Sequence, residues 1–183
     1  MFETARFIQD CCDGLRETNA HAAIKDIVAR AVVEPREVLA SLGEPKFSGL
    51  QTLFRSETLT ILNVLWGPGM SLYPHDHRMW AVIGIYSGRE DNAFFQRSET
   101  GLRQHGGKTL DSKETIPLGE AVIHAVTNPL DQITAAIHVY GGDFFAVPRS
   151  EWDPQTLQER PFDLEHAKRV FAESNKRLAS AVT

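Results

Sequence analysis

The stretch GMSLYPHDH, residues 69–77, decides the fold of this chain. It leaves a Gly-Pro-Gly turn and continues as a strand-like segment, in which residues two apart point to the same face. His75 and His77 are therefore expected to present two imidazoles side by side on a rigid strand. A single His-x-His pair is weak evidence for a metal site, so its meaning depends on the rest of the chain.

A second stretch, residues 117–128, supplies a third imidazole. It is PLGEAVIHAVTN, in which a turn with proline and glycine precedes His124 and Asn128. A different strand of the same barrel can thus bring His124 to His75 and His77. Three neutral imidazoles leave positions open on a six-coordinate metal, where a substrate and dioxygen can bind. By chemistry alone, such a site suits zinc, copper, nickel or manganese as well as iron.

Short apolar and β-branched runs, separated by turn residues, fill the chain between residues 50 and 148. This spacing predicts a β-sandwich or barrel. Gly106–Gly107 is expected to form one of the turns, with His105 exposed beside it. The expected strands are Thr58–Trp66, Met79–Tyr86, Ala93–Gln96, Ala121–Val126, Ile133–Tyr140 and Phe144–Val147.

Both ends of the chain are expected to be helical. In residues 1–48, apolar residues recur near a period of 3.6. Pro35 there suits the first turn of a short helix that ends near Gly43. Residues 163–179 carry one apolar stripe, and Asp163 suits the N-cap position of that helix.

Composition and charge restrict the class of protein. The chain has 183 residues, of which 42% are hydrophobic and 23% charged, and this is typical of one globular domain over residues 1–183. The interspersed charges sum to −5, which argues against nucleic-acid binding. No run reaches the roughly 18 apolar residues of a membrane span, and no secretory signal is visible. The only two cysteines are adjacent, so a reduced, cytoplasmic protein is predicted, of open oligomeric state.

The two histidine stretches together resemble the two cupin motifs. Residues 69–77 match the first motif and residues 117–128 the second. The usual cupin glutamate falls near Ala81 or Val82, and neither side chain can bind a metal. A cupin with three histidines and no glutamate resembles the thiol dioxygenases, the group of cysteine dioxygenase and 3-mercaptopropionate dioxygenase. The segment IHVYGGD at residues 137–143 supports this branch, and the absence of a cysteine that cross-links to the tyrosine favours the bacterial type.

The resemblance covers roughly residues 50–153 and implies a cupin barrel, a double-stranded β-helix of the jelly-roll kind. His75, His77 and His124 match the three iron ligands of the family, which implies one mononuclear Fe(II) and dioxygen as co-substrate. The implied reaction adds both oxygen atoms to the sulfur of a small thiol carboxylate, similar to 3-mercaptopropionate or cysteine, and yields a sulfinate.

The same resemblance implies roles for residues near the metal. His138 and Tyr140 match part of a Ser-His-Tyr hydrogen-bonded relay, whose tyrosine places a proton donor near the substrate. Ala136 stands where the serine is expected, so this relay is incomplete. Arg149 resembles the arginine that binds the substrate carboxylate in 3-mercaptopropionate dioxygenases. Arg55 roughly resembles its counterpart in cysteine dioxygenases.

Other residues and other functions complete these expectations. Trp66 and Trp80 are expected in the core or the wall of the substrate pocket, where Trp80 and Leu72 limit the access of water. Arg89 and Glu90 follow a turn glycine and are expected to form surface charge.

Two alternative functions stay open because a fold does not settle chemistry. They are a metal-binding cupin without turnover, such as a sensor or ligand-binding module, and a dioxygenase acting on carbon.

Overall fold

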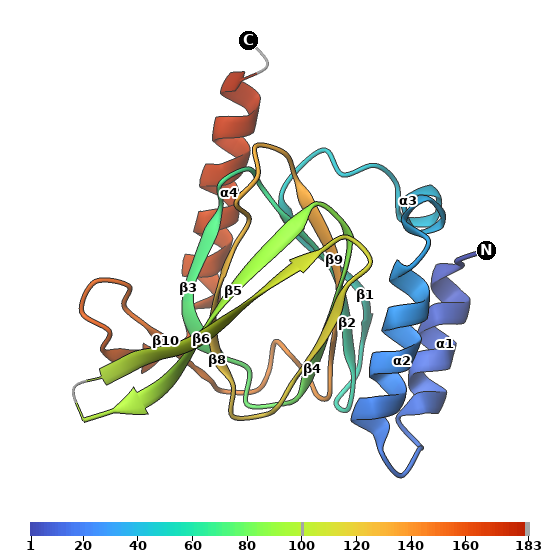
Figure 1. Cartoon of the computed structure of the whole chain (residues 1–183), viewed down its shortest axis with the longest axis horizontal. Helices are drawn as coiled ribbons and strands as arrows, with labels where there is room; N and C mark the ends of the chain where they lie inside the picture. The colour runs from blue at the N-terminus through green and yellow to red at the C-terminus, as the bar shows by residue number, and fades with distance from the viewer. Residues whose placement is uncertain (100, 182–183) are drawn as a thin grey trace.

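The computed structural model of the protein describes residues 1–99 and 101–181. Two antiparallel sheets pack face to face around the core, and helices lie outside them (Figure 1). In spatial order, the first sheet consists of β1 (Gly49–Arg55), β2 (Thr60–Trp66), β9 (Thr134–Tyr140), β4 (Ala81–Ser87) and β7 (Thr115–Leu118). The second consists of β11 (Glu159–Pro161), β10 (Ser150–Trp152), β3 (Ser71–Asp76), β8 (Ile123–Thr127), β5 (Arg89–Ser98) and β6 (Gly101–Asp111).

The chain changes sheets at most connections between β2 and β9. Strands β2, β4, β7 and β9 belong to the first sheet, whereas β3, β5, β6 and β8 belong to the second. The pairs β2–β9 and β3–β8 join strands that are distant in sequence. This alternation is that of a double-stranded β-helix, so the predicted fold class is confirmed.

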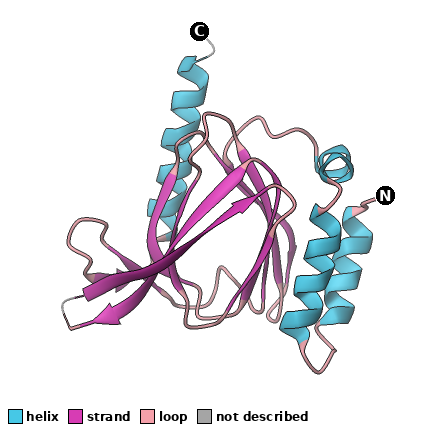
Figure 2. Ribbon diagram, in the orientation of Figure 1, coloured by secondary structure: helices cyan, strands magenta, loops and turns pink. Residues whose placement is uncertain are grey.

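The central strands of the first sheet are buried on both faces. Every residue of β2 and β9 is buried, which explains why both strands are nearly continuous apolar runs. Their inner faces line the barrel. Their outer faces are covered by the predicted N-terminal helices α1 (Thr4–Gly14), α2 (Ala20–Val32) and α3 (Pro35–Leu42), as Figure 2 shows.

Glycine is required where α2 crosses β4. A Cβ atom at Gly84 would lie 2.5 Å from Cγ1 of Val28, so any side chain there would push the helix away from the sheet. The close approach of α2 to β4 thus depends on one residue, and it lets the helix seal the outer face of the sheet.

Helix α4 (Leu164–Ala181) lies on the other side of the barrel from α1 and α2 (Figure 2). Asp163 caps it as predicted, because its side chain accepts a hydrogen bond of 2.9 Å from the amide of Glu165. Phe171 of α4 stacks on Trp66, with ring centroids 5.4 Å apart. Among the described residues, no helix is long and apolar enough to cross a membrane.

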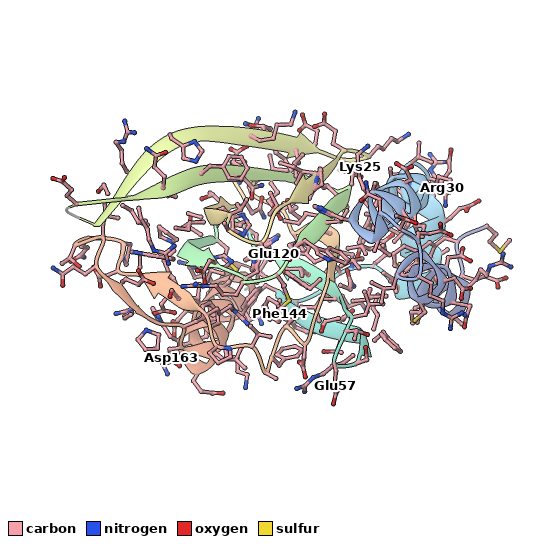
Figure 3. The ribbon with its side chains drawn as sticks, turned by 90° about the horizontal axis from the view of Figure 1, so that it is seen from below. Lys25, Arg30, Glu57, Glu120, Phe144 and Asp163 are labelled. Atoms are coloured by element: carbon pink, nitrogen blue, oxygen red, sulfur yellow. The ribbon has the colours of Figure 1, made fainter. Side chains whose placement is uncertain are left out.

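Two local predictions are wrong. Phe144–Val147 forms a turn instead of a strand, because the Asp143 carboxylate accepts the amide of Phe145 at 3.0 Å. Apolar residues gather in this turn since it packs over one end of the barrel, where Phe144 lies near the middle of the molecule seen from below (Figure 3). Gly106–Gly107 lies inside β6, opposite Phe94 and Ala93 and next to a bulge at His105 of the same strand, instead of forming a turn.

Candidate metal centre

The three predicted ligands meet inside the barrel. His75 is the second-last residue of β3, and His77 is the first residue after that strand. His124 lies opposite His75 in β8. The Nε2 atom of His77 is 3.2 Å from that of His75 and 3.3 Å from that of His124. The possible ligand atoms of the three all lie within 4.8 Å of one another, and all three side chains are buried.

These separations fit one metal ion. Two nitrogens bound to the same ion at about 2.1 Å each, with an angle of about 90–110° between them, lie about 3.0–3.4 Å apart. The spacing around His77 falls in that range. Three nitrogen donors with no carboxylate suit iron, zinc, copper or nickel, so this donor set alone does not identify the metal.

Hydrogen bonds aim the imidazoles at the centre. Nδ1 of His75 donates to the carbonyl oxygen of Tyr73 at 3.0 Å. Nδ1 of His124 donates to Oδ1 of Asn92 at 2.7 Å. With Nδ1 protonated in both rings, the Nε2 lone pairs are free to bind a metal.

Burial keeps the imidazoles neutral. It lowers the pKa of His75 to about 4 and the pKa values of His77 and His124 well below their ordinary range. The neighbouring imidazoles lower the pKa of His77 and of His124 further. Since only a neutral imidazole is a ligand, the site is already in its binding state at neutral pH.

The metal-free protein is expected to lose stability as the pH falls from 6.5 to about 4. In this window the unfolded chain protonates His75, with a pKa near 6.5, while the folded protein does not. His75 alone accounts for about 3 kcal/mol of unfolding free energy, all of it lost below about pH 4. Urea unfolding of the metal-free protein across this range measures the effect. The His75→Gln variant is expected to show a flatter dependence, and an identical dependence would contradict the assignment.

Tyr140 and His138 project into the same space from β9. Nδ1 of His138 lies 2.9 Å from the hydroxyl oxygen of Tyr140, and the Tyr140 ring contacts the His77 ring with centroids 5.0 Å apart. Burial raises the pKa of Tyr140, so its side chain stays a neutral phenol and a proton donor. The residues of the predicted incomplete relay therefore reach the metal centre.

The expectation that Glu90 forms surface charge is wrong. Glu90 is fully buried, and its Oε2 atom lies 3.6 Å from Nε2 of His138. The reason is the alternation along β5, where Glu90 and Asn92 point inward while Arg89 and Asp91 are partly exposed. Glu90, Asn92 and Phe94 are spaced two residues apart, and this alternation is the sequence signal that could have placed Glu90 on the inner face of a strand.

Arg149 is a buried cation without an anionic partner among the described residues. Its guanidinium lies 4.1 Å from the ring centroids of both Phe144 and Phe162, which line the cavity beside the histidines. Its Nη1 donates to the carbonyl oxygen of Phe144, whereas its buried Nε has no acceptor in the described part of the chain. Burial lowers the pKa of Arg149, but a guanidinium stays charged in proteins.

The cavity itself is small and apolar. Besides the histidines and Tyr140, its wall contains Leu72 and Trp66, as expected for both, and Phe171 from α4. The volume beside the histidines is about 30 Å³, room for about two water molecules. The site is thus shielded from solvent by the barrel and by α4.

Arg55 and Trp80 lie outside this cavity. Arg55 forms a bidentate ion pair with Asp143 at 2.9 Å, with about half of its side chain exposed. Trp80 stacks on His21 of α2, with ring centroids 5.2 Å apart, and covers Gly141. The structure therefore packs Arg149 against two rings that line the cavity and leaves the two other predicted substrate contacts on the outside of the barrel.

No family model matches the chain. It is 17% identical to a conserved protein of unknown function from Streptococcus pyogenes, with 54% of this chain and 77% of that one covered and a TM-score of 0.44. Identity is 12% with an RmlC-like cupin family protein with a double-stranded β-helix fold from Methanocaldococcus jannaschii, with 56% and 87% covered and a TM-score of 0.47.

An oxalate decarboxylase variant from Bacillus subtilis is 15% identical, with 56% of this chain and 28% of that one covered and a TM-score of 0.44. Likenesses of this size assign neither a family nor a function to the chain. It is the sheet topology of the chain that defines its fold as the mainly β double-stranded β-helix of the cupins, with N-terminal helices, a C-terminal helix and three histidines that can hold a metal ion.

Proposed function

We propose that the protein is a thiol dioxygenase that uses one Fe(II) and oxidises the sulfur of a small mercapto-carboxylate to a sulfinate. One observation carries the proposal. A centre of three imidazoles without a carboxylate lies within electrostatic reach of Arg149, a buried guanidinium that lacks an anionic partner among the described residues and packs on two rings of the cavity wall. A substrate with one thiolate and one carboxylate satisfies both groups at once.

The proposed reaction balances without a further reductant. A thiol and dioxygen give a sulfinate and one proton, since both oxygen atoms bond to sulfur and the four electrons that sulfur loses reduce the dioxygen. When bound, the iron supplies the activation of dioxygen and a coordination position that favours the thiolate. The chain supplies the geometry and the electrostatics around it.

Arg149 is proposed to bind the carboxylate. A guanidinium can form two parallel hydrogen bonds with a carboxylate, and the unsatisfied Nε is one of the donors available for them. Phe144 and Phe162 hold the guanidinium plane between their rings and keep water away from it. Its charge already reaches the histidines, because it lowers the pKa values of both His75 and His77.

Tyr140 is proposed to orient the substrate at the metal centre. Its hydroxyl is held by His138 and its ring packs against His77, so the phenol lies at the edge of the site. As a neutral phenol it has one proton, which it can donate to Nδ1 of His138 in the free protein and to an oxygen or sulfur atom that carries negative charge when the substrate is bound. The small cavity favours a thiol of few carbons.

Oxygen uptake after anaerobic reconstitution with Fe(II) tests the proposal. The panel is cysteine, 3-mercaptopropionate, mercaptosuccinate and cysteamine, the last of which lacks a carboxylate. We expect one dioxygen consumed per sulfinate formed with a mercapto-carboxylate and little turnover of cysteamine. No thiol-dependent uptake by iron-loaded protein would exclude thiol oxidation and leave a ligand-binding cupin or a dioxygenase acting on carbon.

Replacing Arg149 by glutamine is expected to raise the KM for a mercapto-carboxylate by about 10–100-fold. The variant loses a charge-assisted hydrogen-bonded pair, worth about 1.5–3 kcal/mol. The KM for cysteamine, if it turns over, is expected to change much less. Arg55→Gln is the matched variant, since Arg55 pairs with Asp143 at the surface. A rise in KM with Arg55→Gln and none with Arg149→Gln would move the carboxylate site to Arg55.

A further inference from the structure

A single buried carboxylate connects the metal ligands to the Tyr140 hydroxyl. Glu90 is fully buried, and three side-chain nitrogen atoms from three strands surround it. Nε1 of Trp66 donates to its Oε2 at 2.8 Å and Nδ2 of Asn92 donates to its Oε1 at 2.9 Å. Nε2 of His138 lies 3.6 Å from Oε2. Among the described residues, no lysine or arginine pairs with Glu90.

The surroundings leave little freedom in this network. A buried carboxylate is costly unless donors surround it, and the Trp66 indole can only donate. The Asn92 amide must turn its nitrogen to Glu90 because its oxygen faces Nδ1 of His124. Nε2 of His138 is buried and has no hydrogen-bond partner within 3.5 Å in the described part of the chain. Oε2 of Glu90, at 3.6 Å, is thus the carboxylate oxygen available to a proton on this nitrogen.

We propose that Glu90 is a positioning residue for both halves of the centre. Through Asn92 it holds the ring of His124 in the orientation that binds metal. Through a proton on Nε2 of His138 it holds that imidazole against the Tyr140 hydroxyl. The consequence for Tyr140 in catalysis rests on the proposed function, whereas the orientation of the two histidines does not.

This role supplies what the expected serine of the relay would provide. Ala136 stands at that position, two residues before His138 on β9, and has no hydroxyl to anchor the imidazole. Glu90 anchors it from the opposite sheet, since β5 belongs to the second sheet and β9 to the first. The carboxylate therefore also ties the two sheets together at the metal centre.

Glu90→Gln is the informative substitution because it keeps the size of the side chain. A carboxylate has two oxygens for the three donors, whereas an amide has one oxygen and adds its own N–H groups. At least one of Trp66, Asn92 and His138 then faces a donor. Asp91→Asn is the matched control, since Asp91 is the next residue of β5, is partly exposed, and pairs with Arg89.

The test uses zinc-loaded protein and does not depend on thiol oxidation. In NMR spectra of protein with ¹⁵N-labelled histidine, wild-type His138 is expected to carry a proton on Nε2. In Glu90→Gln, the His138 nitrogen signals are expected to shift and zinc affinity to fall about 10–100-fold. Asp91→Asn is expected to match the wild type in both measurements.

Two results would overturn the proposal. One is a wild-type His138 whose single proton lies on Nδ1, and this result decides the matter even if Glu90→Gln fails to fold. The other is a folded Glu90→Gln variant whose His138 signals and zinc affinity equal those of Asp91→Asn. A protein that oxidises no thiol can still pass this test, so a failure of the proposed function and a failure of this inference are distinguishable.

Discussion

A His124→Ala variant is expected to bind no iron or zinc after dialysis while the barrel stays folded. His124 supplies one of three nitrogen donors, and among the described residues no fourth histidine, cysteine, aspartate or glutamate belongs to the group of possible ligands. The affinity should fall by more than the roughly 10–100-fold that follows loss of an outer hydrogen-bond partner. The fold should survive, because the unpaired Oδ1 of Asn92 costs only about 1–3 kcal/mol.

Metal content per chain measures the loss of metal binding in His124→Ala, and the near-ultraviolet circular dichroism spectrum measures whether the barrel stays folded. His105→Ala is the matched control, since His105 is exposed on β6, away from the three ligands. We expect His105→Ala to retain wild-type metal content. Full metal occupancy in folded His124→Ala would show that the ligand set is assigned wrongly.

The features that depend on local periodicity could be predicted from the sequence. Strands β2 and β9 were expected because residues buried on both faces form nearly continuous apolar runs. The convergence of His75, His77 and His124 followed from their spacing within two motif-like stretches, and the structure places their Nε2 atoms together. Edge strands such as β1 and β6 were not predicted, because half-exposed strands mix polar and apolar residues.

The surroundings of the site depend on pairing between distant segments, and local patterns do not determine such pairing. Glu90 follows a turn glycine as a surface residue often does, yet the pairing of β5 with β8 directs it inward. Arg55 and Trp80 lie close in sequence to residues of the site. Their side chains nevertheless leave the cavity, because one pairs with Asp143 and the other stacks on α2.

Replacing Asn128 by alanine is expected to lower the free energy of unfolding by about 3–5 kcal/mol. Asn128 is fully buried and joins the turn after β2 to the turn between β8 and β9. Its Oδ1 accepts hydrogen bonds from the amide of Leu130 and the hydroxyl of Thr134, both at 3.0 Å. Its Nδ2 lies within hydrogen-bond distance of three backbone carbonyls, those of Trp66 (3.0 Å), Gly67 (2.9 Å) and Gln132 (2.8 Å).

Urea unfolding of the metal-free variants separates the loss of these hydrogen bonds from the loss of volume. Asn128→Asp keeps the shape of the side chain but replaces the Nδ2 donor with an oxygen that faces three carbonyl oxygens. It should therefore be at least as unstable as Asn128→Ala, whereas a packing effect alone would leave it near the wild type. Asp131→Ala, an exposed position in the same turn, should change stability by less than about 0.5 kcal/mol. If Asn128→Ala costs less than about 1 kcal/mol, water satisfies these carbonyls and Asn128 does not hold the two turns together.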